Sequence, residues 1–243
     1  MTQCCYIGKG IVYGRLAGSA APALAFGNVS KLALNISTEE KTVKDYTTGG
    51  GGNACSLVRV SDIAAAITMN CMSADNIARA IAGTAGTVAA GAVTNSQRTA
   101  YKGGFVPVAP GYTSLVVKNQ AGSTTYVLNT DYTLTTNGII ILAAGAITDG
   151  QIITVSYTGV ALDTVDILTG AFGEFQLYFD GLNEIDSGKG VLVELYKFKF
   201  GPAAALELIG DDPSELAVTG KLNADTTKTG VGVSQYMKMQ FLQ

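Results

Sequence analysis

Apolar and polar residues alternate in several short runs of this sequence, and glycine-containing turn signals separate the runs. The alternation is clear in "VSKLALNIS" (residues 29–37) and continues in "SLVRV" (residues 56–60). Because successive side chains of a strand point to opposite faces of a sheet, this spacing predicts strands with one buried and one solvated face. Further β-rich runs lie at residues 113–119, 124–135, 138–142, 151–159, 172–181 and 190–202. The chain is therefore predicted to be mainly β.

One segment departs from this pattern and predicts a helix. In "MSADNIARAIAG" (residues 72–83), Ser73 stands where a helix N-cap is expected, and Gly83 stands where a left-handed residue would end the helix. We expect a short α-helix that flanks a sheet. The following residues, 84–97, are small, uncharged and glycine-rich, which indicates a loop or a weak edge structure.

The character of the sequence changes between residues 101 and 159. Short β-rich runs are separated there by Ala-Gly, Asn-Gly and Asp-Gly dipeptides at residues 121–122, 137–138 and 149–150. Because such dipeptides are strong turn signals, they predict a small immunoglobulin-like or meander module inserted as residues 101–159. The flanking residues, 1–100 and 160–243, would then form one discontinuous β-domain.

Residue types on which most enzymes depend are absent or scattered. The 243 residues include no histidine, which removes the usual general base and the commonest metal ligand. Carboxylates cluster only at Glu39–Glu40 and in "GDDPSE" (residues 210–215), and neither cluster has the ligand spacing of a calcium loop. We therefore predict that the protein is not an enzyme and uses no metal or cofactor.

Charged residues are sparse. They make up 14% of the chain, against about 25% in typical soluble domains, which favours a protein that assembles. The formal net charge is −3, whereas DNA-binding proteins usually carry clustered Lys and Arg residues. Sequence-specific DNA binding is therefore not expected. The most apolar run, residues 138–147, is shorter than the roughly 20 residues of a membrane helix, so no membrane span is expected. Four cysteines without CxxC spacing, Cys4, Cys5, Cys55 and Cys71, predict free and mostly buried thiols.

Four consecutive glycines, residues 49–52, lie between the first two alternating runs. A phosphate-binding Walker loop would continue with Lys, Ser or Thr and a helix, whereas Asn53 and a strand-like run follow here. A flexible linker is the simplest alternative, because glycine loses the most conformational freedom on ordering. Strand-like runs on both sides instead place the glycines inside a domain. We expect a long loop that becomes ordered on contact with a partner.

Several loose patterns, taken in order, resemble the major tail tube proteins of long-tailed bacteriophages. They are "YIGKGIVYGRL" (6–16), "FGNVSKLALNISTEEKTVKDYTTGGGG" (26–52), "NIARAIAG" (76–83) and the segment from "FGEFQLYFDG" to "KLNAD" (172–225). The resemblance covers most of the chain outside the insertion. It implies a tail-tube-type β-sandwich or barrel with one short flanking α-helix. It also implies a structural virion protein whose hexameric rings stack into the tail tube, the conduit for DNA ejection into the host.

The same resemblance implies the partners and the location of the protein. The subunit would bind other copies of itself, contact the tape-measure and tail-terminator or tip proteins, and let DNA pass without sequence-specific binding. It would assemble in the cytoplasm of the bacterial host and reside in the tail of the virion.

In tail tube proteins a long loop between two lumen-side strands contacts the neighbouring ring. The matching positions here run from about Glu39 to Asn53, and Lys31, Asn35 and Arg59 would lie on the lumen-facing sides of the two strands. The predicted ring-stacking residues are Glu39, Glu40, Lys41, Lys44, Asp45, Tyr46, Gly49, Gly50, Gly51, Gly52 and Asn53. Their charged members would pair across rings, which sets register more than affinity.

A decoration or adhesion module that binds host glycans is the alternative function. Tyr126 and Tyr132 of the insertion would present their rings to sugars, although tyrosines in β-rich runs are more often ordinary strand residues. In the tail tube hypothesis the insertion is expected on the outer surface of the tube, because a bulky module would obstruct the lumen.

Overall fold

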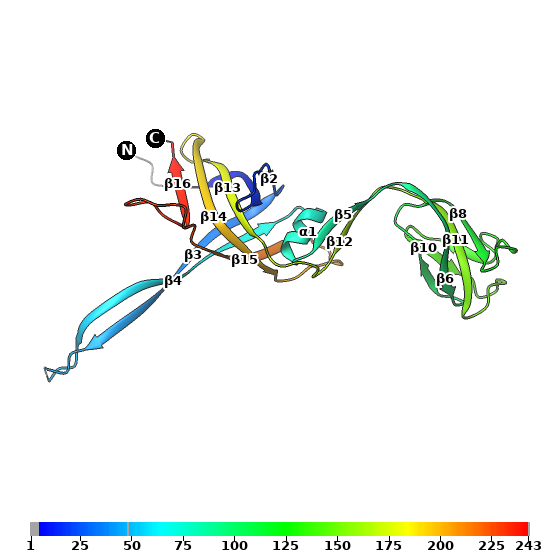
Figure 1. Cartoon of the computed structure of the whole chain (residues 1–243), viewed down its shortest axis with the longest axis horizontal. Coiled ribbons are helices and arrows are strands. Elements are labelled where there is room, and N and C mark those ends of the chain that lie inside the picture. Colours follow the sequence, from blue (N-terminus) through cyan, green and yellow to red (C-terminus); the bar gives the residue numbers. More distant parts are fainter. Residues whose placement is uncertain (1–4, 48, 243) are drawn as a thin grey trace. The chain divides into compact units, whose positions relative to one another are not determined.

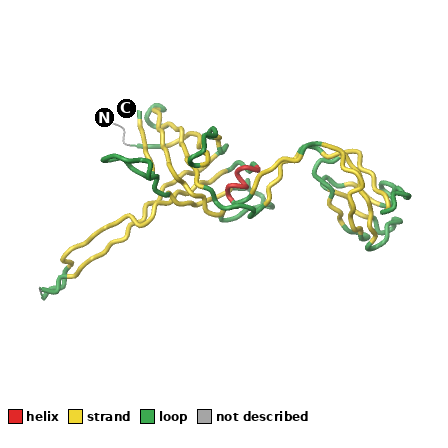
Figure 2. The backbone as a smooth tube through the Cα atoms, in the orientation of Figure 1, coloured by secondary structure: helices red, strands yellow, loops and turns green. Residues whose placement is uncertain are grey.

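The chain folds into two compact units, which Figure 1 shows in the colours of the sequence. The computed structural model describes residues 5–47 and 49–242. The first unit combines the chain up to Ala85 with the chain from Val165 onward, and the second unit is Gly86–Thr164. Strands dominate both units, and the described residues form one short helix (Figure 2). The prediction of a mainly β fold is therefore confirmed.

The first unit is built on one antiparallel sheet of eight strands. Seven of them follow the spatial order β2-β1-β13-β14-β15-β4-β3, and the eighth, β16, pairs with the first part of β14. The strands are β1 (Gly8–Leu16), β2 (Leu24–Ala25), β3 (Val29–Lys44), β4 (Asn53–Met69), β13 (Glu174–Asn183), β14 (Lys189–Ala203), β15 (Leu216–Leu222) and β16 (Met237–Phe241).

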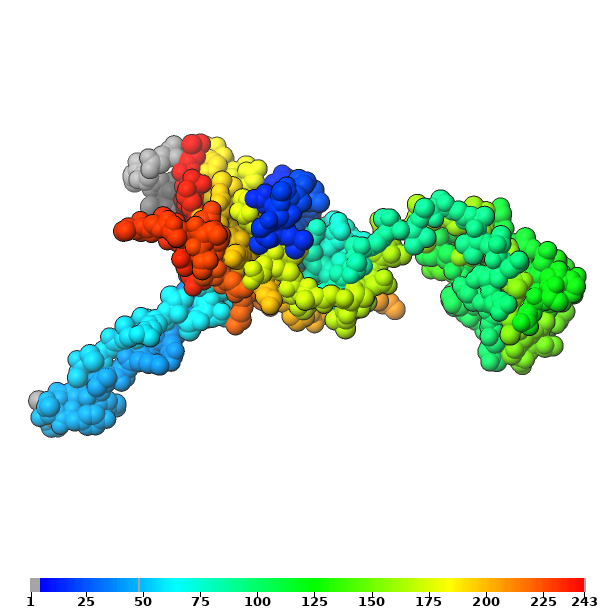
Figure 3. All heavy atoms as spheres, in the orientation of Figure 1, coloured from blue at the N-terminus to red at the C-terminus, as the bar shows by residue number. Residues whose placement is uncertain are grey.

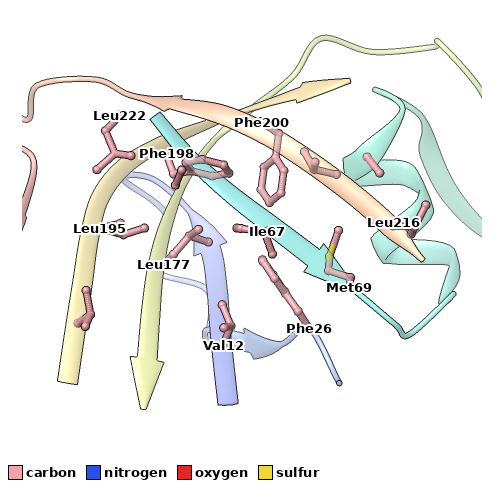
Figure 4. Packing of buried hydrophobic residues seen from close by; sticks show 14 of the residues in the cluster. Val12, Phe26, Ile67, Met69, Leu177, Leu195, Phe198, Phe200, Leu216 and Leu222 are labelled. Carbon is pink, nitrogen blue, oxygen red and sulfur yellow. The ribbon is translucent and has the colours of Figure 1, made fainter. Parts of the chain in front are cut away.

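One face of this sheet carries the hydrophobic core of the first unit. In Figure 4 the side chains of Val12, Ile67, Leu177 and Leu195 point toward one another from four different strands. The alternation of side chains along a strand explains this burial. In β15, for example, residues from Leu216 to Leu222 are alternately buried and exposed. The predicted strands thus bury their apolar sides together.

The helix α1 (Ala74–Ala80) packs beside β14 and β15. The Ser73 hydroxyl accepts the backbone N–H of Asn76 at 3.2 Å, so the predicted N-cap is confirmed. The predicted end was wrong by one residue. Ala82 adopts the left-handed conformation (φ +50°), while the N–H of Gly83 reaches back to the Ala78 carbonyl at 2.8 Å.

The second unit is a small sandwich of two three-stranded sheets. One sheet has the order β7-β10-β9 and the other has the order β6-β11-β8. Buried residues from both sheets form a single core cluster. The strands are β6 (Gly91–Ala100), β7 (Phe105–Pro107), β8 (Thr113–Asn119), β9 (Tyr132–Leu134), β10 (Gly138–Ile141) and β11 (Gln151–Gly159).

The structure corrects two sequence-based expectations about the insertion. Residues 84–97 contain strands β5 (Thr84–Val88) and most of β6, so the loop reading is wrong, while the alternative of an edge structure agrees with the position of both strands at the edges of their sheets. The second unit also begins earlier than the predicted residue 101, because β6 pairs along β11 in its own sheet. Strand β5 pairs with β12 (Leu162–Asp166), and this two-stranded ribbon joins the units.

Neither unit forms a closed barrel in the part of the chain that the structure describes. The eight-stranded sheet of the first unit curves, yet its end strands do not pair with each other. Strand β2 pairs with only Tyr13 and Gly14 of β1, and β3 pairs only with β4. Unpaired strand edges result at both ends of the sheet, and such edges tend to be covered by another chain.

Candidate assembly site: the β3–β4 arm

The outer halves of β3 and β4 form a two-stranded ribbon, residues 38–60, which we call the arm. Its register runs from Thr38 opposite Val60 to Lys44 opposite Asn53. Strand β15 pairs with β4 only between Ala64 and Met69, so it does not reach the arm. Figures 1 and 3 show the arm standing clear of the rest of the first unit. Both of its faces are therefore exposed to solvent.

The structure corrects the prediction of a long loop between Glu39 and Asn53. Glu39, Glu40, Lys41 and Lys44 belong to β3, and Asn53 begins β4. The β-branched residues Thr38, Thr42 and Val43 favour a strand, and every residue from Thr38 to Lys44 finds a cross-strand partner in β4. The loop therefore comprises only residues 45–52.

The tip of the arm is a hydrogen-bonded turn. The backbone N–H of Asp45 donates to the Gly52 carbonyl at 2.8 Å, and the N–H of Thr47 donates to Asp45 Oδ1 at 2.7 Å. A Cβ added at any of the four glycines would meet nothing within 4 Å. Only Gly51 has a positive φ (+60°), so it alone needs to be glycine for conformational reasons.

The register places the three predicted lumen-facing residues on one face. Lys31 and Asn35 alternate with the core-facing residues Leu32 and Leu34 along β3, and Arg59 lies opposite Glu39, which continues that outer face. Lys31, Asn35 and Arg59 are all exposed. The structure thus brings these residues to one surface, and whether that surface lines a channel stays a prediction.

Charges on the arm interact within the chain. The Glu39 carboxylate lies 3.8 Å from Lys41 Nζ on the same face, and both side chains are exposed. An exposed pair of this kind contributes about 0–1 kcal/mol. The pairing of Glu39, Glu40, Lys41, Lys44 and Asp45 with a second ring stays a prediction.

Exposed apolar side chains other than Tyr46, which was among the predicted stacking residues, are the feature of the arm that the sequence reading missed. Tyr46 is 87% exposed and Val58 is 59% exposed. The other exposed apolar residues of the arm are Val43, Leu57 and Val60. A two-stranded ribbon is marginally stable on its own in water. The arm is therefore expected to gain stability when another surface covers its apolar residues.

The thiols were predicted to be mostly buried, which is wrong for two of them. Cys5 and Cys55 are exposed, and Cys71 is half-buried. Cys55 is exposed because it lies on the arm, opposite Val43. The three are free, and Cys4 lies outside the described residues.

Within residues 5–47 and 49–242 there is no group of three or more Cys, Asp or Glu side chains arranged to hold a metal ion. The only helix there, α1, has 7 residues, too few to cross a membrane.

Comparison with known proteins assigns the chain to a family. Residues 5–240 match the model of a family described as "Protein of unknown function UCP028589". The chain belongs to this family. The matched span includes both units and the arm. No curated protein matches the sequence.

Proposed function

We propose that this chain is a structural virion protein whose hexameric rings stack to form the tail tube of a long-tailed bacteriophage. The arm is the observation that carries the proposal. It is a paired ribbon with exposed apolar residues on both faces, and the other strands of the sheet do not cover it. Such a surface suits contact with a second subunit. The assignment to a bacteriophage tail rests on the resemblance of the ordered sequence patterns described above to major tail tube proteins.

The arm would dock on the adjacent ring of the stack. Val58 and Val60 lie on the face that continues the core side of the sheet, while Leu57 and Val43 lie on the other face. A ribbon with apolar residues on both faces can be covered from two sides, as happens when it enters a space between neighbouring subunits. Each covered valine or leucine would stabilise the contact by about 1.5–3 kcal/mol.

The outer face of the sheet is proposed to face the channel through which DNA passes. Two of the cations on this face, Arg59 and Lys221, have acidic neighbours, whereas Lys31 has no ion-pair partner among the described residues. Arg59 lies opposite Glu39, and Lys221 Nζ lies 3.1 Å from Asp62 Oδ2. Neutralised cations attract phosphates weakly, so DNA would move without sequence-specific binding. Tape-measure and tail-terminator or tip proteins are the further partners proposed, with assembly in the host cytoplasm.

The glycan-binding alternative loses the residues on which it rested. Tyr126 and Tyr132 are buried in the core of the second unit, and the Tyr126 hydroxyl is hydrogen-bonded to Gln151 Nε2 at 2.6 Å. Neither ring is available to a sugar. The second unit is instead proposed to lie on the outside of the tube.

Electron microscopy of the purified protein tests this function. The protein is concentrated at neutral pH and examined in negative stain, beside light scattering of a dilute sample. Hollow tubes with a regular axial repeat and sixfold rings in end views are the expected result. A protein that stays monomeric at every concentration, including after addition of preformed tube ends from a phage lysate, would contradict the proposal.

A further inference from the structure

The opening between β1 and β3 contains a cavity, which we call the seam cavity. Its volume is about 820 Å³, within the roughly 300–1,000 Å³ typical of binding pockets. Residues 6–10 and Val12 border it on one side, and residues 28–32 and Leu34 border it on the other. Phe179, Val193 and Met239 complete its lining with apolar side chains. The unpaired edges of the sheet thus enclose a groove with a largely apolar floor.

The charge of the seam cavity has one sign. Among the described residues that line the cavity, Lys9 and Lys31 are the only charged ones, and none is a carboxylate. Within the described residues, neither lysine lies within 4.0 Å of a carboxylate, since the ion pairs found there involve other lysines. A partner that combines apolar side chains with carboxylates therefore fits this groove.

The loop between β14 and β15 has these properties. We call its residues 206–212, "LELIGDD", the acidic loop. Leu208 is 81% exposed and Ile209 is 97% exposed, and Glu207, Asp211 and Asp212 are exposed beside them. The loop is held at its base, because Leu206 packs against the core and the Ser214 hydroxyl donates to the Glu207 carbonyl at 2.9 Å. The side chains of Leu208 and Ile209 are thus exposed to solvent next to the carboxylates of the acidic loop.

The acidic loop and the seam cavity lie near opposite ends of β14. Val193, which lines the cavity, belongs to the first part of the strand, whereas the loop follows its last residue, Ala203. Ten residues of extended strand span about 30 Å. One copy therefore does not fill its own cavity. A contact between two different patches of identical subunits is heterologous, and heterologous contacts close into rings when the rotation permits.

We propose that Leu208 and Ile209 of one copy enter the seam cavity of the next copy, with the acidic loop's carboxylates facing Lys9 and Lys31. The inference rests on the proposed function, because its partner is a second copy of the chain. It adds a lateral contact within one ring, separate from the contact that the arm makes between rings.

Charge reversal on the two sides tests this contact in the full-length chain. One variant carries Lys9→Glu and Lys31→Glu, a second carries Asp211→Lys and Asp212→Lys, and a third carries all four substitutions. The concentration at which rings appear is measured by sedimentation velocity. Each double variant alone is expected to need a concentration at least about tenfold higher than wild type, because like charges meet across the contact. The fourfold variant, and an equimolar mixture of the two double variants, should recover to within about threefold of wild type.

A matched control separates the contact from a general effect of charge. Lys102→Glu with Lys118→Glu makes the same change of charge in the second unit and should assemble as wild type does. Circular dichroism checks that every variant is folded. Assembly of both double variants at the wild-type concentration overturns the lateral contact and leaves the proposed function intact, as does a failure of the fourfold variant and the mixture to recover. Wild-type protein that stays monomeric even after addition of preformed tube ends overturns both.

Discussion

Glu39 on β3 lies directly opposite Arg59 on β4, and Lys41 Nζ approaches the same carboxylate to 3.8 Å. Opposite charges therefore face each other across the exposed ribbon of the arm. Cross-strand pairs of this kind stabilise a sheet by about 0.2–1 kcal/mol. Because no other strand covers the arm, this small term is a larger share of its local stability than it would be in a core strand.

Reversing Arg59 should loosen the arm without unfolding the protein. In Arg59→Glu, two carboxylates face each other, and amide hydrogens of residues 38–60 are expected to exchange about twofold to fivefold faster at low salt. Exchange is measured by mass spectrometry of peptides from the arm. The swapped variant Glu39→Arg with Arg59→Glu should return the rate to the wild-type value. Equal exchange in all three proteins would show that the pair does not interact.

Exposed valines of the arm are expected to matter for assembly and not for folding. Val58→Ser with Val60→Ser should change the free energy of unfolding by less than about 0.5 kcal/mol, because both side chains are already in water. The onset concentration for tubes should rise about tenfold per residue, since each valine would be buried only in the assembly. Light scattering and thermal unfolding provide the two readouts.

Val127→Ser is the control for this pair of substitutions. Val127 is exposed to a similar degree in the second unit, so its loss should leave both readouts unchanged. If Val58→Ser with Val60→Ser assembles as readily as Val127→Ser does, the arm is not the stacking surface.

Two glycines at the tip should respond differently to alanine. Gly51 has φ +60°, so Gly51→Ala is expected to cost the turn about 1 kcal/mol. Gly50 has open space around it and no positive φ, so Gly50→Ala should be neutral or slightly stabilising. Amide exchange at residues 45–47 measures the difference. Identical behaviour of the two variants would mean that the tip does not keep this turn in solution.

Asn76 connects the helix to the edge of the core. It is 2% exposed, and its Nδ2 donates to the carbonyls of Phe26 at 2.8 Å and Cys71 at 3.0 Å, while its Oδ1 accepts from Arg79. Asn76→Ala leaves these partners unsatisfied, and we expect a loss of roughly 2–3 kcal/mol in the stability of the first unit. Denaturant unfolding measures it, with the exposed Asn35→Ala as control. A loss below about 0.5 kcal/mol would contradict this role.

Local sequence patterns correctly predicted several strands and the start of the helix. The errors arose where the structure depends on pairing between strands far apart in the sequence. The alternation at residues 29–37 and 56–60 correctly indicated strands, and Ser73 correctly indicated a helix start. The charged stretch after Ser37 was interpreted as a loop, because polar residues on both faces resemble a loop until the partner strand is known. The one-residue error at Gly83 has a similar origin, since its close approach to the Asp166 carbonyl is a tertiary contact.

The arm and the seam cavity could likewise be predicted from the sequence only in part. The sequence identified the residues of the arm by resemblance, but their exposure depends on β15 ending its pairing at Ala64 and Lys221. The seam cavity depends on which strand edges remain unpaired, which no local pattern records. Tyr126 and Tyr132 were considered for glycan binding because sequence alone does not say which face of a strand is buried. Which side chains are buried and which strand edges stay unpaired depend on how all the strands of a sheet pair, so a local sequence pattern does not determine them.

Asp131 makes the stability of the second unit depend on pH. Hydrogen bonds from the backbone N–H groups of Ala146 and Val127, both 2.8 Å long, hold the pKa of this buried carboxyl below its ordinary value of 3.8, and they outweigh the opposing effect of burial. A group whose pKa is lower in the folded protein contributes stability above its unfolded pKa and loses it as pH falls through the folded value. The second unit should therefore weaken below about pH 4.

The variant Asp131→Asn tests this dependence. An amide has one acceptor oxygen, so one of the two N–H groups loses its partner, and we expect roughly 1–3 kcal/mol less stability at pH 7. The variant should also lose the part of the acid dependence that comes from this carboxyl. Amide exchange in peptides of the second unit, followed from pH 7 to pH 2.5 with intrinsic rates subtracted, reports both effects. Asp163→Asn, at an exposed position of the same unit, is the control, and a slope shared by Asp131→Asn and wild type would assign the acid sensitivity to other carboxyls.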